Sequence, residues 1–209
     1  MKRSPRPPIR RVGLTGGIGA GKSAVAELLR EAGVFVVNLD DLGRKITEED
    51  PKIIARINEA CGILGSTFDR QRVREVIFSK PEVRTAIEGW LHPIILKGFE
   101  AEVEAAATEG RRILVCEAAL LVEGNYHKDL DDLIVVTAPV ALRKQRLIER
   151  DAVSPEIADK MIASQMPEEA KRNLATVVIE NEGDLDTLEE NVEELLETWR
   201  ADGLLDKLH

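Results

Sequence analysis

The segment Gly16–Ser23 constrains this chain more than any other part of it. It reads Gly-Gly-Ile-Gly-Ala-Gly-Lys-Ser, which is the GxxxxGK[ST] pattern of a phosphate-binding loop. Glycines let the backbone turn its N–H groups toward phosphate oxygens, and a helix beginning at Lys22 would add the positive end of its dipole. A glycine-rich turn that binds nothing would not require Lys-Ser at this spacing. The residues predicted to bind the nucleotide are Gly17, Ile18, Gly19, Ala20, Gly21, Lys22, Ser23 and Ala24.

Short β-rich runs and helical stretches alternate around this loop. Residues 34–38 contain almost no polar side chain, which predicts a strand buried on both faces. Five strands alternating with helices predict an α/β fold, a five-stranded parallel sheet with helices on both faces. The strands are expected at residues 11–15, 34–38, 112–117, 133–137 and 177–180.

Residues 41–110 show helical patterns and no strand pattern, which predicts a helical substrate-binding subdomain inserted in the core. The core itself is expected at 11–40 and 111–201, including a helical lid at about 143–172. Residues 1–10 are basic and rich in proline, so we predict a disordered tail there. Helices are expected at residues 22–32, 52–61, 70–78, 81–90, 93–108, 140–150, 155–165, 168–174 and 185–201.

Composition narrows the possible partners. The net charge of −9 argues against an extended nucleic-acid interface, and no apolar run approaches the ~18 residues of a membrane span. Cys61 and Cys116 lack zinc-ligand or CxxC spacing, and Cys116 lies in an apolar run, as an inert core thiol would. Proline residues interrupt the basic start, so no signal peptide is expected. We therefore predict a cytoplasmic protein that is a monomer or a weak oligomer.

The loop alone does not distinguish kinases from GTPases, motors or transporters. A guanine-reading NKxD and an LSGGQ motif are absent, and the Asp-x-x-Gly at Asp40–Gly43 follows the second strand after a short crossover. A small kinase needs an acceptor subdomain and cations over the moving phosphoryl group. Arg143, Arg146 and Arg150 lie three and four residues apart on one helix face, although such a run is also typical of a solvated face. The sequence thus predicts an ATP-dependent kinase with Mg²⁺ on the Ser23 hydroxyl and Lys22 at the β- and γ-phosphates.

Beyond the loop, a series of short elements from Val12 to about Trp199 resembles the dephospho-coenzyme A kinases. Their order and spacing carry the resemblance, because no single element is decisive. The elements are Gly13–Ser23, Asn38-Leu39-Asp40 with Arg44, Phe68-Asp69-Arg70, Val76-Ile77-Phe78, Leu91-His92-Pro93, Glu117, Leu120–Glu123, Arg146-Leu147 with Arg150-Asp151, Gln165-Met166-Pro167, Lys171-Arg172 and Ile179-Glu180-Asn181.

Three positions depart from the pattern of that family. Asn38 stands where the family usually has the first carboxylate of Asp-Ala-Asp, Arg143 replaces a common Gln, and Ala119 replaces Pro. None of these changes removes a phosphate ligand. The first bears on mechanism, because an amide at position 38 cannot act as a base.

The resemblance implies that the acceptor is the ribose 3′-hydroxyl of dephospho-coenzyme A. Asp40, just beyond a parallel strand, is predicted to orient this hydroxyl and take its proton, with Asp41 as the alternative. Either aspartate could instead cap the following helix. Lys22, Arg146 and Arg150 are predicted to surround the phosphates when the lid closes.

Three further residues are predicted to bind the substrate. Glu117 ends an apolar strand and could orient a metal-bound water, or be a partly exposed strand-end acid. Arg44 could pair with a substrate phosphate, or be a surface cation. His92 is placed in the acceptor pocket by the resemblance, whereas histidines before proline are more often helix-terminus or packing residues. Two other functions stay open: another small-molecule or nucleotide kinase, and a nucleotide switch without acceptor chemistry.

Overall fold

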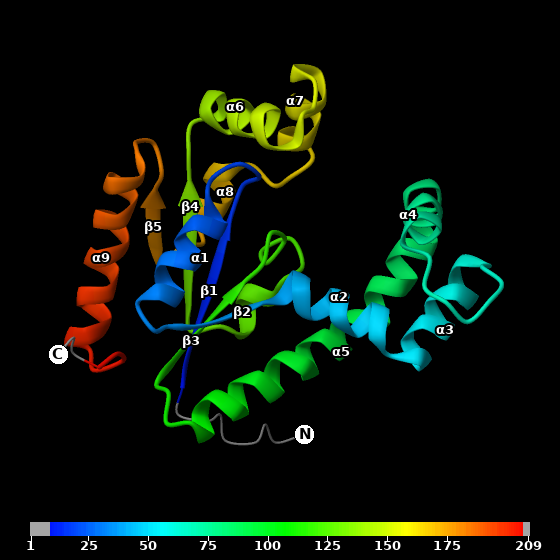
Figure 1. The fold of residues 1–209 in the computed structure, drawn as a ribbon, viewed down its shortest axis with the longest axis horizontal. Helices are drawn as coiled ribbons and strands as arrows, with labels where there is room; N and C mark the ends of the chain where they lie inside the picture. The colour runs from blue at the N-terminus through cyan, green and yellow to red at the C-terminus, as the bar shows by residue number, and fades with distance from the viewer. Residues whose placement is uncertain (1–8, 207–209) are drawn as a thin grey trace. The chain divides into compact units, whose positions relative to one another are not determined.

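A computed structural model describes residues 9–206 and contains the predicted five-stranded sheet (Figure 1). The strand order is β2-β3-β1-β4-β5. β1 lies in the centre and pairs in parallel with β3 and β4, and β4 pairs in parallel with β5. The strands are β1 Arg10–Gly16, β2 Phe35–Asn38, β3 Ile113–Glu117, β4 Asp132–Thr137 and β5 Val177–Glu180.

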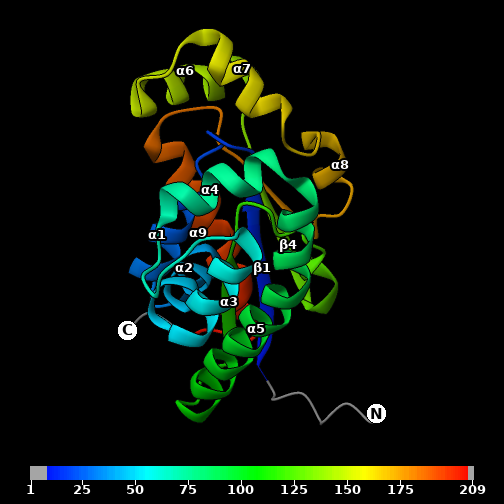
Figure 2. The same ribbon diagram turned by 90° about the vertical axis from the view of Figure 1, so that its right-hand side faces the viewer.

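Helices cover both faces of the sheet, as predicted. In Figure 2, α1 and α9 lie on one side of β1 and β4, and α8 lies on the other. Val25 and Leu29 of α1 pack with Val192 and Trp199 of α9 in the main hydrophobic core. The helices are α1 Lys22–Glu31, α2 Leu39–Glu49, α3 Pro51–Cys61, α4 Arg70–Ser79, α5 Pro81–Thr108, α6 Val140–Asp151, α7 Pro155–Ala163, α8 Glu168–Arg172 and α9 Leu185–Ala201, with a short 3-10 helix, η1, at Tyr126–Asp129.

The chain divides into two compact units. One is formed by the chain up to Val37 and from Val103 onward, and the other by Asn38–Glu102. The first unit contains the sheet, the phosphate loop and α6–α9. The second contains α2, α3, α4 and most of α5, and most of the predicted helical subdomain falls within it. It has a hydrophobic cluster of its own, built from Ile53, Ile57, Cys61, Val73 and Ile87.

Several sequence-based expectations need correction. β2 is half-buried rather than buried on both faces, because it is the edge strand beside β3. The two helices expected at 81–90 and 93–108 are one continuous helix, α5, with Pro93 inside it. Pro93 lacks an N–H, but the flanking turns keep the helical path. The η1 turn was not predicted.

The predicted tail also needs correction at its inner end. Residues 1–8 lie outside the described residues, but Ile9 is buried and Arg10 begins β1. The Nε of Arg10 lies 2.5 Å from Oδ2 of Asp132 on β4. This ion pair raises the pKa of Arg10 and ties the first strand to its neighbour. Residue 10 therefore belongs to the sheet, and residue 9 is buried just before it.

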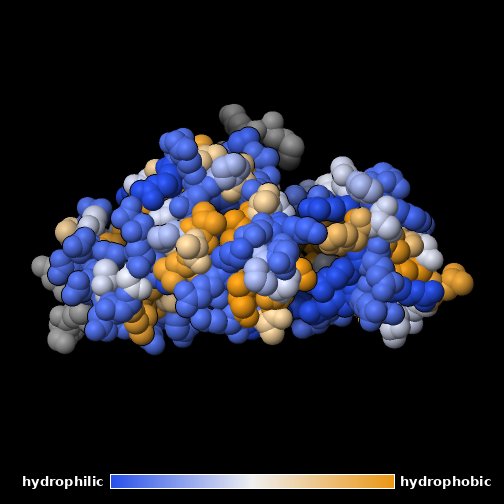
Figure 3. Space-filling model, turned by 90° about the horizontal axis from the view of Figure 1, so that it is seen from above, coloured by the Kyte–Doolittle hydropathy of each residue, from blue (hydrophilic) through white to orange (hydrophobic). Residues whose placement is uncertain are grey.

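The surface is mainly hydrophilic, with separate hydrophobic areas on the face seen in Figure 3. Within residues 9–206, no helix combines the length and the apolar character needed to cross a lipid bilayer. Cys61 and Cys116 are both buried and lie outside any disulfide within the described residues, and burial raises the pKa of Cys61. The prediction of an inert core thiol at Cys116 agrees with its position in β3.

The start of α9 provides a test by pH. Oδ1 of Asp184 accepts hydrogen bonds from the Thr187 N–H at 3.0 Å and from the Thr187 hydroxyl at 2.9 Å. These bonds lower the pKa of Asp184 in the folded protein. The stability that the ionised carboxylate contributes is therefore fully present above the ordinary aspartate pKa and is lost as the pH falls through the lowered pKa. Asp184→Ala should therefore lower the melting temperature at neutral pH and much less at strongly acidic pH.

Asp184→Asn is the matched control, because an asparagine side chain caps helices without titrating. Its melting temperature should stay near that of the wild type at neutral pH. An equal loss for Asp184→Ala at both pH values would contradict the assignment of the cap to the ionised carboxylate.

Candidate active site

The phosphate loop links β1 to α1 by a tight turn. The N–H of Ala20 donates to the carbonyl of Gly17 at 3.0 Å, and Gly19 and Gly21 have φ of 78° and 94°. These left-handed conformations suit glycine. Gly21 is also the N-cap of α1 and has no side chain to bind the first N–H groups of the helix. The start of α1 can therefore bind an anion through its backbone and its dipole.

A buried carboxylate lies beside the start of α1. Glu117 ends β3 and is only 2% exposed, so the expectation of a partly exposed acid was wrong. Its Oε1 lies 2.5 Å from Nζ of Lys22 and 3.5 Å from Oγ of Ser23. Its Oε2 accepts from Nη2 of Arg30, near the end of α1, at 3.3 Å. Two cations therefore compensate this carboxylate for its loss of hydration.

Side chains from outside the loop bind its carbonyl groups, among them Arg146 and Asn181. Nη1 of Arg146 on α6 donates to the carbonyl of Gly19 at 3.3 Å, and its Nη2 donates to Oδ1 of Asn181 at 3.1 Å. Nδ2 of Asn181 donates to the carbonyl of Ala20 at 2.8 Å. Arg146 and Asn181 thus brace the loop through the carbonyl groups of Gly19 and Ala20.

The three lid arginines do not form the solvated face that was the alternative for them. Arg143 is buried and forms an ion pair with Glu168 at 3.3 Å, and burial lowers its pKa. Arg150 is exposed and forms hydrogen bonds of 2.7 and 2.8 Å with Asp151, which raise its pKa. The three side chains therefore differ in burial and in partner.

A cavity of about 670 Å³ opens over the phosphate loop. Such a volume is typical of sites for small-molecule ligands. Lys22, Ser23, Arg146 and Arg150 from the predicted site line it, so the structure brings these four residues together. The other lining residues are Gly16, Gly17, Ile18, Gly19, Gly21, Ala119, Glu149 and Gln165.

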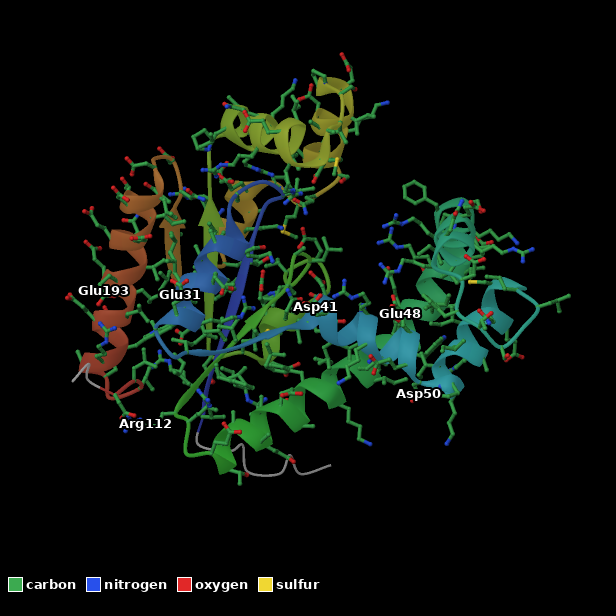
Figure 4. All side chains as sticks on the ribbon, viewed as in Figure 1. Glu31, Asp41, Glu48, Asp50, Arg112 and Glu193 are labelled. Atoms are coloured by element: carbon green, nitrogen blue, oxygen red, sulfur yellow. The ribbon has the colours of Figure 1, made fainter. Side chains whose placement is uncertain are left out.

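The start of α2 shows what the substitution at position 38 does. Oδ1 of Asn38 accepts the N–H of Asp41 at 3.0 Å, so Asn38 is the N-cap of α2. The alternatives in which Asp40 or Asp41 caps this helix are therefore wrong. Asp41, labelled in Figure 4, instead forms an ion pair of 2.7 Å with Arg44, and both side chains are more than half exposed. Asp40 lies in the first turn of α2.

His92 is in the interior of α5, next to Pro93, and is half-buried. The alternative of a helix-terminus histidine is therefore wrong. Asp40, Arg44 and His92 all belong to the unit Asn38–Glu102, whereas the phosphate loop and Glu117 belong to the other unit. The predicted site residues thus form two groups, one in each unit.

Two residues at the phosphate loop, Ser23 and Glu117, could hold a divalent cation that prefers oxygen ligands. Ser23 Oγ and the Glu117 carboxylate offer neighbouring oxygen atoms, which are the ligands that Mg²⁺ prefers. Within residues 9–206, no group of three or more His, Cys, Asp or Glu residues could hold a metal ion by itself. This donor set fits a cation held by one or two protein oxygens together with substrate phosphates.

Comparison with known proteins identifies the family to which this chain belongs. The family model described as dephospho-CoA kinase matches residues 10–187. The chain belongs to the dephospho-CoA kinase family. The sheet, the phosphate loop and the helical unit all fall within the matched residues.

Relatives in this family cover nearly the whole chain. The dephospho-CoA kinase of Deinococcus radiodurans is 38% identical, over 90% of this chain and 94% of its own length. That of Chlorobaculum tepidum is 37% identical, over 90% and 93%. A crystal structure of a Thermus thermophilus protein, 33% identical, superposes with a TM-score of 0.79 over 91% of this chain and 97% of its own.

Three residues at the site were not predicted. Arg30 was not considered because its partner Glu117 lies far away in sequence. Gln165 and Asn181 occur in elements that carry the family resemblance, but their contacts with the loop were not foreseen. Both are polar residues next to a predicted helix or strand end, which is the signal that could have marked them.

Gly21 and Gly33 allow a matched test of how tightly the loop is held. Both have a left-handed φ, of 94° and 81°, so alanine at either position should cost about 1–2 kcal/mol of strain. A Cβ at Gly21 would collide with Nδ2 of Asn181, whereas a Cβ at Gly33 would meet nothing within 4 Å. Gly21→Ala should therefore lose about 1 kcal/mol more in the free energy of unfolding, measured by urea denaturation.

Equal losses for the two variants would contradict the close packing of the loop against Asn181. A larger loss for Gly33→Ala would contradict it as well.

Proposed function

We propose that the protein transfers the γ-phosphoryl group of ATP to the ribose 3′-hydroxyl of dephospho-CoA, giving CoA and ADP. Membership in the family over residues 10–187 carries the proposal. The cavity over Gly16–Ser23, with Lys22 and an oxygen pair beside the start of α1, supports ATP as the phosphoryl donor. We also place the reaction in the cytoplasm.

The phosphate loop is the proposed binding site of the ATP phosphates. Its backbone N–H groups and the first turn of α1 hold the β-phosphate, and Lys22 neutralises charge on the β- and γ-phosphates. Ser23 and Glu117 are the residues that would hold Mg²⁺, which draws charge from the phosphate oxygens when bound. Because Glu117 pairs with Lys22 at 2.5 Å, we infer that nucleotide entry redistributes Lys22 from Glu117 to the phosphates.

Asp40 is the proposed partner of the acceptor hydroxyl. It follows β2 and stands in the first turn of α2, and Asn38 rather than Asp40 caps that helix. The carboxylate would orient the 3′-hydroxyl for in-line attack and take its proton as the new O–P bond forms and the bond to the ADP oxygen breaks. Arg44 and His92 are the proposed acceptor-pocket residues of the same unit.

Arg146 and Arg150 are the proposed charge-stabilising residues of the lid. Both line the cavity, and a guanidinium can hold phosphate oxygens through two parallel hydrogen bonds. Arg150 is 65% exposed, so it can turn from Asp151 toward a bound phosphate. Closing α6 over the nucleotide would exclude water and limit ATP hydrolysis.

An assay with several acceptors tests the function. Purified protein with Mg-ATP is offered dephospho-CoA, AMP, adenosine or shikimate, and ADP release is followed by a coupled reaction. We expect release with dephospho-CoA alone. Release with another acceptor would replace the proposed substrate, and no acceptor-dependent release would favour the nucleotide-switch alternative.

The choice between Asp40 and Asp41 follows from paired variants. Asp40→Asn should lower kcat by about 10²–10⁴-fold, because general-base catalysis contributes on that scale. Asp41→Asn should change kcat little, because Asp41 forms an exposed pair with Arg44, and such pairs contribute little. The opposite ranking of kcat in the two variants would assign the role to Asp41.

A further inference from the structure

One residue of the phosphate loop, Ile18, has both of its backbone polar groups bound by side chains of the predicted lid segment. The N–H of Ile18 donates to Oε1 of Gln165, in the connection between α7 and α8, at 2.7 Å. The carbonyl of Ile18 accepts from Nε of Arg143 on α6 at 2.9 Å. No other residue of the loop has both its N–H and its carbonyl bound by side chains, as far as the described residues show.

The direction of these bonds matters for phosphate binding. In a trans peptide, the carbonyl of one residue and the N–H of the next point in opposite directions. When Arg143 holds the Ile18 carbonyl, the N–H of Gly19 points in the opposite direction, away from the Arg143 guanidinium. Gly19 and Lys22 line the cavity over the loop, where the phosphates are proposed to lie.

The contact between Arg143 and the loop leaves no spare room. Arg143 is 4% exposed, and its Nη1 lies 3.3 Å from Oε2 of Glu168. A Cβ on Gly17 would collide with the Arg143 guanidinium, and a Cβ on Gly19 would lie 2.7 Å from the Arg143 carbonyl oxygen. The peptide between Ile18 and Gly19 can therefore not turn over without moving Arg143.

We propose that Arg143 and Gln165 are positioning residues that fix the two peptide groups on either side of Ile18 in the orientation that binds ATP. The inference deepens the proposed function, because it concerns the ATP side of the same site. Neither side chain is required to touch the reacting atoms. Their effect should appear in the affinity for the nucleotide and not in the affinity for the acceptor.

Two variants each remove one of the two side-chain hydrogen bonds to the Ile18 backbone. Gln165→Leu removes the acceptor for the Ile18 N–H, and Arg143→Met removes the donor to its carbonyl. Gln165 is half-buried in a connection, so its variant tests the proposal even if Arg143→Met folds poorly. Lys144→Met is the control, because Lys144 is the next residue of α6 and pairs with Asp159 at 2.7 Å, away from the loop.

The main measurement is the Kd for Mg-ATP by titration calorimetry, which needs no acceptor. Each of the two variants should raise Kd about tenfold, and Lys144→Met should leave it within twofold. The double variant should raise Kd by less than the product of the single effects, because the two peptide groups that are held meet at the Cα of Ile18. In the acceptor assay, the KM for ATP should rise in parallel and the KM for dephospho-CoA should stay unchanged.

Amide hydrogen exchange of the loop without nucleotide separates positioning from general stability. Exchange of the segment Gly16–Lys22 should accelerate in Gln165→Leu, whereas Gln165→Glu, which keeps an acceptor oxygen, should leave it slow. An unchanged Kd in Gln165→Leu, or equal rises in both KM values with a matching fall in melting temperature, would overturn the proposal. If the variants change the Kd for Mg-ATP as expected but the wild type phosphorylates no dephospho-CoA, the proposed function fails and the positioning role stands.

Discussion

The ion pair between Lys22 and the buried carboxylate of Glu117 joins the elements on which the site depends. It connects the end of β3 to the start of α1, and Arg30 binds the second oxygen of the same carboxylate. A carboxylate that is 2% exposed is costly unless it is paired, so this position requires cations on both sides. The arrangement keeps Lys22 at the mouth of the phosphate loop and leaves Ser23 next to a carboxylate oxygen.

The backbone of the phosphate loop is held in place by hydrogen bonds to side chains from outside the loop. The successive carbonyl groups of Ile18, Gly19 and Ala20 accept hydrogen bonds from Arg143, Arg146 and Asn181. Gln165 accepts the N–H of Ile18. Such preorganisation lowers the entropy that a ligand must remove on binding. The same helix, α6, also carries the exposed Arg150.

The sequence predicted the architecture well and the contacts of the site only in part. The bounds of β5 and α9 follow from local pattern, because a short apolar run and a long amphipathic stretch are each unambiguous. The edge position of β2 did not follow, since an apolar run does not tell how many neighbours a strand has. The cap at Asn38 was not predicted, because Asn38, Asp40 and Asp41 are all of residue types that favour the N-cap position and the sequence alone does not rank them. The pairing of Arg30 with Glu117 depends on the strand order, which the sequence alone does not fix.

The most direct test of the account is the position of the phosphate in the product. Dephospho-CoA and Mg-ATP are incubated with the protein, and the product is analysed by mass spectrometry and by phosphorus NMR. The account predicts a product heavier by one phosphoryl group, with a phosphomonoester coupled to the ribose H3′. A phosphate at another position, or ADP formed with unmodified dephospho-CoA, would contradict it.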